Sequence, residues 1–156
     1  MMYSSGADLS KEEFSVCLAG YNLKQQSHHV IARKVFANRP GGHKACLSWL
    51  RGHAGQAGSL WVSMEATGVY YEPLALYIAE HAPDIHLSVV LPSKAKRYLQ
   101  SCGLRSKTDK IDAYGLALMG AERVLAGWAG IDPFWRNLRQ LTRTRCGTTG
   151  SGMIRR

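Results

Sequence analysis

The sequence predicts an α/β fold in which a mixed sheet, with the element order βββαβαβ, is followed by helices. Apolar and smaller or polar residues alternate with a period of two over residues 14–19, as they do in half-buried strands, and residues 30–36 are rich in β-branched residues. Short amphipathic segments then alternate with short apolar segments as far as residue 91, and the spacing beyond is helical. The first three strands are therefore expected to form an antiparallel meander. The alternating helices and strands that follow imply that the later strands are parallel to their neighbours, with helices on the faces of the sheet.

The first third of the chain contains the three strands of the meander. We expect these strands over residues 3–9, 14–19 and 30–36. In the second strand, Phe14 and Val16 alternate with smaller residues, which places both on one face of the sheet. A polar stretch before the third strand provides the turn.

The middle of the chain contains the alternating units. A Pro-Gly-Gly break at residues 40–42 is expected to precede a short amphipathic helix over residues 45–51. An apolar strand follows over residues 60–64. The next helix has Pro73 in its first turn, which is a favoured position for proline. A strand over residues 85–91 completes the sheet.

Helices are expected after the sheet, over residues 93–102, from 106–108 to 125, and over 134–145. The first of them is basic. On the last, Arg136, Arg139 and Arg143 recur at i, i+3 and i+7, so they share one face of the helix. These arginines are therefore candidates for binding nucleic acid.

The distribution of charge is the most unusual property of the sequence. The 156-residue chain has a formal charge of +9, yet its first 93 residues hold seven basic and seven acidic residues. Residues 94–156 hold the other thirteen basic residues against four acidic ones. Such one-sided charge indicates a polyanionic partner, most simply nucleic acid, although a basic soluble surface would give the same count.

The composition excludes several classes of protein. With 46% hydrophobic and 20% charged residues, the chain is expected to form one globular domain. No apolar run reaches the roughly 18 residues of a membrane span. The polar N-terminus has no signal peptide, so we expect a cytoplasmic protein without a membrane partner. The four cysteines form no CxxC pair and His43 with Cys46 lacks a second pair, so neither disulfides nor structural zinc is expected.

Four carboxylates occupy positions at which α/β proteins form sites. Asp8 ends the first predicted strand and Glu65 ends the fourth, and sites form at the carboxyl ends of strands. Asp109 and Asp112 are spaced i, i+3, which predicts that they share one helix face. Converging carboxylates repel one another without a cation, and oxygen ligands suit Mg²⁺ or Mn²⁺. Two such ions about 4 Å apart support phosphodiester chemistry.

Each carboxylate also has a simpler interpretation. Asp8 fits a turn residue, and Glu65 fits a surface charge at a strand end. Asp109 fits a capping box opened by Ser106, and Asp112 fits an exposed pair with a neighbouring lysine. Taken singly, these interpretations are favoured. Taken together and in this order, the four residues favour a site.

Three motifs resemble those of one transposase family. They are Gly-Ala-Asp-Leu-Ser-Lys at residues 6–11, Met-Glu-Ala-Thr-Gly-Val-Tyr at 64–70, and the segment 103–113 with Arg-Ser-Lys-Thr-Asp-Lys-Ile-Asp. This order and spacing resemble the DEDD insertion-sequence transposases, which include the pilin-gene inverting recombinases. The resemblance implies a ribonuclease H-like fold, akin to that of Holliday-junction resolvases, and DNA cleavage and joining with divalent metal ions, for which two Mg²⁺ or Mn²⁺ ions are expected.

The resemblance also assigns roles to residues. It implies that the metal ligands and catalytic residues are Asp8, Glu65, Asp109 and Asp112. The basic residues of the third motif, Arg105, Lys107 and Lys110, are expected to contact nucleic acid, because phosphate contacts position the substrate.

The resemblance further implies a division of the chain. Residues 1–130 would form the catalytic domain, and residues 131–156 the start of a helical linker with an irregular tail. Family members continue into a C-terminal domain with a serine that acts in strand transfer. No part of this sequence matches that domain, and Ser151 lies in no matching motif, so the activity is expected to be incomplete.

The implied partner is DNA, both at the element ends and at the target. Some family members also use an element-encoded guide RNA. The full-length protein is expected to be a homo-oligomer in the prokaryotic cytoplasm, associated with the nucleoid.

Two other functions fit parts of the pattern. The arginine stripe also fits a non-catalytic fragment that binds nucleic acid without metal. An actin-like or sugar-kinase-type ATPase shares the implied fold. Its phosphate-binding hairpin needs glycines beside the aspartate, and residues 9–12 contain none.

Overall fold

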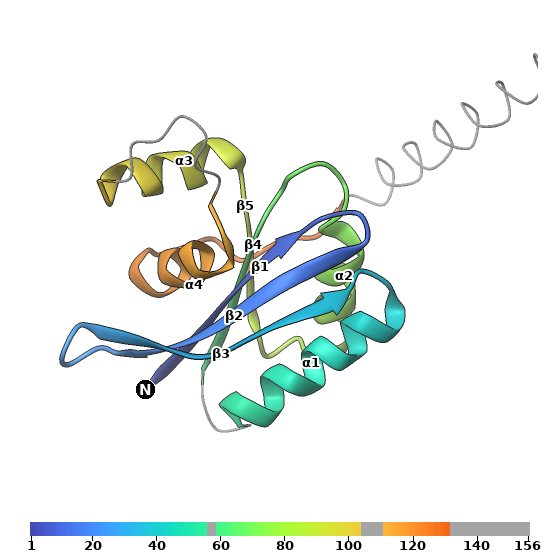
Figure 1. The fold of residues 1–156 in the computed structure, drawn as a ribbon, viewed down its shortest axis with the longest axis horizontal. Helices are drawn as coiled ribbons and strands as arrows, with labels where there is room; N and C mark the ends of the chain where they lie inside the picture. The colour runs from blue at the N-terminus through green and yellow to red at the C-terminus, as the bar shows by residue number, and fades with distance from the viewer. Residues whose placement is uncertain (56–58, 104–110, 132–156) are drawn as a thin grey trace, which may run out of the picture.

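The computed structural model describes residues 1–55, 59–103 and 111–131, which form a five-stranded sheet with helices on both faces (Figure 1). The elements are β1 (Met2–Leu9), β2 (Glu13–Asn22), β3 (Ser27–Ala37), α1 (Pro40–Ala54), β4 (Leu60–Glu65), α2 (Glu72–His81), β5 (His86–Val90), α3 (Pro92–Ser101) and α4 (Ala113–Glu122). The predicted order of strands and helices is therefore confirmed.

The strands lie in the order β3-β2-β1-β4-β5. β1, β2 and β3 form an antiparallel meander, whereas β4 and β5 run parallel to β1. Short turns join the antiparallel strands, and the helices α1 and α2 make the longer connections that parallel strands require. This is the mixed sheet expected of a ribonuclease H-like fold.

The two faces of the sheet have separate cores. α1 and α2 cover one face, where the largest buried side chains are Phe14, Leu18, Leu50, Met64 and Ile78. α3 and α4 lie together on the other face (Figure 1). Their core is smaller and includes Leu116 and Met119.

Small residues allow α4 to pack very closely on β1 and β4. A Cβ atom on Gly6 would lie 2.0 Å from the carbonyl oxygen of Ala113, and one on Gly120 would lie 2.5 Å from Oγ of Ser63. The hydroxyl of Ser4 donates a hydrogen bond of 2.6 Å to the carbonyl oxygen of Ala117. The position of α4 over the centre of the sheet thus depends on the absence of side chains there.

The bounds of two predicted helices were wrong. The first helix begins at Pro40 rather than at residue 45, because proline at the first helical position is favourable. Gly42 lies inside that helix, and a Cβ atom there would lie 1.7 Å from the carbonyl oxygen of Ala37. The long helix predicted to end at residue 125 is α4, which begins only at Ala113 and ends at Glu122.

The helix predicted over 134–145 lies outside the described residues. Within the described ranges, no helix is both long enough and apolar enough to cross a membrane.

Candidate active site

Asp8 and Glu65 are neighbours at the carboxyl edge of the sheet. β1 and β4 are parallel, and their register pairs Gly6 with Ser63 and Ala7 with Met64. The next step of this register brings Asp8, the last residue but one of β1, beside Glu65, the last residue of β4. Both residues are partly buried. Residues in register on parallel strands point to the same face, so the two carboxylates face the same way.

That face is the one covered by α4. Gly6 and Ser63, two residues before Asp8 and Glu65, both lie against α4. Because side chains alternate along a strand, Asp8 and Glu65 also point to the α4 side of the sheet. The first two predicted site residues are therefore brought together.

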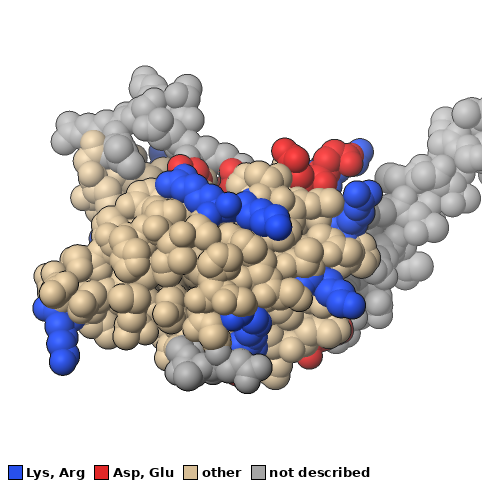
Figure 2. Space-filling model, turned by 60° about the horizontal axis from the view of Figure 1, so that its bottom comes forward, with Lys and Arg blue, Asp and Glu red and all other residues tan. Residues whose placement is uncertain are grey.

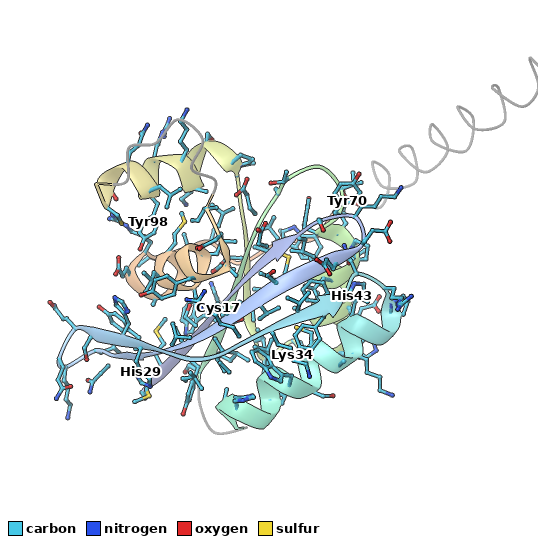
Figure 3. All side chains as sticks on the ribbon, viewed as in Figure 1. Cys17, His29, Lys34, His43, Tyr70 and Tyr98 are labelled. Carbon is cyan, nitrogen blue, oxygen red and sulfur yellow. The ribbon has the colours of Figure 1, made fainter. Side chains whose placement is uncertain are left out.

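Asp112 approaches the same edge from α4. It is the N-cap residue of that helix, directly before Ala113, whose carbonyl oxygen lies next to Gly6. Cys17 of β2, which is labelled in Figure 3, pairs with Gly6 of β1. The charge of Asp112 acts on the Cys17 thiol. Burial raises the pKa of the Cys17 thiol most, Arg33 lowers it, and Asp112 raises it further. Three elements thus contribute one carboxylate each to this region.

Hydrogen bonds orient two of these carboxylates. Oδ1 of Asp112 accepts a bond of 2.7 Å from the backbone N–H of Gly115. Oε1 of Glu65 accepts a bond of 2.7 Å from the hydroxyl of Thr67. Each bond uses one oxygen of its carboxylate, and the first also satisfies a donor at the start of α4.

The interpretation of Asp109 and Asp112 as residues on one helix face was wrong. Asp112 has extended backbone angles, φ −94° and ψ −179°, because it caps α4 instead of lying within it. Its side chain accepts the capping hydrogen bond from the backbone N–H of Gly115. Asp109 itself lies outside the residues that the structure describes.

The donor chemistry of this edge fits a hard divalent cation, because carboxylate oxygens are the ligands that Mg²⁺ and Mn²⁺ prefer. Within residues 1–55, 59–103 and 111–131, no three His, Cys, Asp or Glu side chains stand close enough together to hold a metal ion. Asp8, Glu65 and Asp112 therefore do not form a closed coordination group by themselves.

The side chain of Asn38 connects the loops that leave this edge, a role that was not predicted from the sequence. Its amide nitrogen donates to the carbonyl oxygen of Ser10 at 2.8 Å and to that of Tyr70 at 3.0 Å. Ser10 lies two residues beyond Asp8, and Tyr70 lies in the loop that follows Glu65. No local pattern marks Asn38, because its partners are 28 and 32 residues away.

A buried histidine fixes the orientation of this amide. Nε2 of His43 lies 2.8 Å from Oδ1 of Asn38. Since the Asn38 nitrogen already donates to two carbonyl oxygens, His43 is the donor in this bond. His43 is 3% exposed, and its burial lowers its pKa, which favours the neutral ring. Figure 3 labels His43 on α1 and Tyr70 in the loop after β4.

Acidic and basic side chains lie side by side on one face of the described part of the molecule (Figure 2). Figure 2 shows acidic side chains gathered along the upper rim of the molecule, with basic side chains beside them. The nucleic-acid contacts predicted from the sequence all lie outside the described residues, namely Arg105, Lys107, Lys110, Arg136, Arg139 and Arg143.

Fold and site together define a class of protein, a ribonuclease H-like domain with carboxylates at the ends of its central strands. A family model described as a transposase matches residues 5–150. The chain belongs to this family of DEDD transposases.

Two relatives are pilin gene-inverting proteins, from Moraxella bovis and Moraxella lacunata. Each is 33% identical to this chain over 117 residues, which are 75% of the chain and 34% of the relative. The match therefore spans about a third of the length of these relatives.

Solved structures also resemble the chain. The crystal structure of the fowlpox virus resolvase with substrate Holliday junction DNA has a TM-score of 0.49 and 12% identity, over 76% of this chain and 93% of the resolvase.

Proposed function

We propose that this chain contains the catalytic domain of a transposase or site-specific DNA recombinase, which binds DNA and cleaves and joins phosphodiester bonds with divalent metal ions. In this proposal residues 1–130 form the catalytic domain, and residues 131–156 begin a linker to further segments. Family membership supports the class of activity.

The observation that carries the proposal is the position of Asp8 beside Glu65 in the parallel register of β1 and β4. Two adjacent carboxylates on one face are costly unless a cation or a proton offsets their repulsion. The N-cap carboxylate of Asp112 approaches the same edge. In the proposal, Asp8 and Glu65 hold metal from the sheet, whereas Asp112 and Asp109 hold it from the segment before α4.

The bound ions would activate a water or hydroxyl group and stabilise the leaving oxygen of the phosphodiester. The protein's own residues position these ligands. Thr67 holds one oxygen of Glu65, and Gly115 holds one oxygen of Asp112. Asn38 holds the two loops at the ends of β1 and β4 at a fixed separation.

The experiment that tests this function compares Asp8→Asn with Glu80→Gln. Glu80 lies exposed on α2, so its substitution also removes one negative charge from the surface but leaves the carboxylate edge intact. Mn²⁺ binding is measured by calorimetry, and cleavage of branched DNA is measured in Mn²⁺. We expect the Asp8→Asn variant to lose both, and the Glu80→Gln variant to keep both.

Metal binding that is unchanged in Asp8→Asn would overturn the site. DNA binding that weakens with salt and needs no metal would support the alternative of a non-catalytic nucleic-acid-binding segment. ATP hydrolysis without action on DNA would support the ATPase alternative.

A further inference from the structure

A basic groove lies between α3 and α4, and none of its residues belongs to the carboxylate site. Its volume is about 290 Å³, and it is open to solvent. The groove is lined by Lys94, Arg97, Tyr98, Ser101, Met119, Arg123 and Val124. Lys94, Arg97 and Ser101 recur at i, i+3 and i+7, so the groove follows one face of α3 for about 10 Å. That length is the rise of about three nucleotides in one DNA strand.

The cationic side chains of this groove are not balanced by acidic ones on its lining. α3 carries three basic residues and no acidic residue. The carboxylate of Glu122 stands next to the groove, and its Oε2 accepts a hydrogen bond of 2.9 Å from the hydroxyl of Tyr98. A site with excess positive charge and no carboxylate among its lining residues favours an anionic occupant.

Arg123 is already held in place for such an occupant. Its guanidinium lies 5.5 Å from the centroid of the Tyr98 ring and donates a hydrogen bond of 3.1 Å to Oγ of Ser101. Ser101 in turn donates to the carbonyl oxygen of Tyr98 at 2.6 Å. An arginine ordered before binding loses less side-chain entropy when it contacts phosphate.

One end of the groove lies on the first turn of α3, which follows β5 at the carboxyl edge of the sheet. Residue 90 ends β5, and α3 begins at Pro92. The backbone N–H of Ala66, which follows Glu65, donates to the carbonyl oxygen of Val90 at 2.9 Å. Lys94, in the first turn of α3, is therefore only four residues after Val90, whose carbonyl oxygen accepts the bond from Ala66. The Lys94 end of the groove is therefore the end directed toward the carboxylate edge.

The apolar part of the lining fits the same occupant. Val124 is fully exposed, and Met119 is buried at the base of the groove. A nucleic-acid strand presents phosphates for the cations and sugar or base surface for these apolar groups.

We propose that the groove between α3 and α4 binds the phosphodiester backbone of a nucleic-acid strand and guides it to the carboxylate edge. Lys94, Arg97 and Arg123 are the phosphate contacts. This inference rests on the proposed function, which names nucleic acid as the partner, but it assigns contacts that the sequence motifs do not include.

The test is binding of labelled 20-nucleotide single strands, one DNA and one RNA of the same sequence, measured by fluorescence anisotropy over a range of salt. The groove variant is Lys94→Gln/Arg97→Gln/Arg123→Gln in the full chain. The control is Lys24→Gln/Lys34→Gln/Lys44→Gln, which removes the same charge from exposed positions on other elements. Thermal unfolding of both variants verifies that they fold.

We expect the groove variant to bind roughly 100-fold more weakly at 0.1 M salt, and its salt slope to decrease by about two, as for the loss of three phosphate contacts. The control should change much less. A larger loss with DNA or with RNA identifies which strand the groove holds.

Equal losses in the two variants, or no loss in the groove variant, would overturn the inference. Competition by millimolar inorganic phosphate or nucleoside triphosphate would also overturn it, because it indicates a pocket for a small anion. The same experiment distinguishes the proposals. If the groove variant binds normally and the native chain still cleaves DNA in Mn²⁺, only the groove fails. If the native chain neither binds nucleic acid nor cleaves it, the proposed function fails.

Discussion

His43 donates a hydrogen bond to Asn38, with 2.8 Å between Nε2 of the ring and Oδ1 of the amide. The rings of Phe14 and Tyr77 lie around His43, with centroids 5.9 and 6.2 Å away. The contact fixes which way the amide points, so that its nitrogen faces the carbonyl oxygens of Ser10 and Tyr70. The positions of the loops after β1 and β4 thus depend on a residue inside α1.

Replacement of Asn38 should therefore affect the carboxylate edge. In Asn38→Ala the two loops lose their shared donor, and we expect the apparent Mn²⁺ affinity to fall about 10–100-fold, as for other residues that orient ligands. The free energy of unfolding should fall by about 1–3 kcal/mol, because the buried His43 is left without its hydrogen-bond partner. Calorimetry and denaturant unfolding measure the two effects.

The control for this substitution is Asn22→Ala. The Asn22 side chain bonds only within its own turn, to Lys24 and Gln25, among the hydrogen bonds of the described residues. It should leave metal affinity unchanged. If Asn38→Ala loses stability but binds Mn²⁺ as the native chain does, Asn38 has a structural role and does not position the site.

Two substitutions at Asp112 separate its capping role from its charge. Asparagine is as effective an N-cap residue as aspartate, so Asp112→Asn should change the free energy of unfolding little. Asp112→Ala should lower the free energy of unfolding by about 1 kcal/mol. Both variants lack the carboxylate, so both should lose Mn²⁺-dependent cleavage. Thermal unfolding and a cleavage assay measure these effects. Full cleavage by Asp112→Asn would show that Asp112 serves only as the cap.

The sequence predicted those parts of the molecule that depend on local pattern. The period of two in residues 14–19 predicted the second strand, and the ends of the first and fourth strands predicted Asp8 and Glu65 as candidate site residues, because sites form at the carboxyl ends of strands. Residues 40–42 were misinterpreted, because a Pro-Gly-Gly sequence fits a loop as well as the first turn of a helix.

The parts that depend on tertiary contacts were not predictable. The role of Asn38 comes from hydrogen bonds across about 30 residues, which leave no periodic signal. The groove requires α3 and α4 to pack side by side, and the sequence alone does not give this pairing. The i, i+3 spacing of Asp109 and Asp112 did not reveal that the backbone at Asp112 is extended.

The close packing of α4 on β1 makes Gly6 intolerant of any side chain. In Gly6→Ala the new methyl group would meet backbone atoms of α4 at 2.0 and 2.6 Å, which cannot rotate away. We expect a loss of at least about 1–3 kcal/mol in the free energy of unfolding, and a Tm lower by several degrees.

The matched substitution is Gly41→Ala, in the first turn of α1. A Cβ atom there has no neighbour within 4 Å, and alanine favours the helix. Its Tm should stay the same or rise. Equal Tm values for the two variants would contradict the packing of α4 described here.

The buried histidine makes stability depend on pH. Burial lowers the pKa of His43 below its ordinary value of 6.5, so the unfolded chain binds the proton more readily than the folded chain. The stabilising contribution is therefore fully present above pH 6.5 and is lost as the pH falls through the lower pKa of the folded state. Within that window the slope attributable to His43 approaches, at most, about 1.4 kcal/mol per pH unit. Denaturant unfolding at several pH values should show a smaller dependence of the free energy of unfolding on pH for His43→Gln, which keeps a donor for Asn38. The control is His53→Gln, at an exposed position, which should keep the native dependence on pH. The same slope in all three proteins would mean that His43 does not titrate with unfolding.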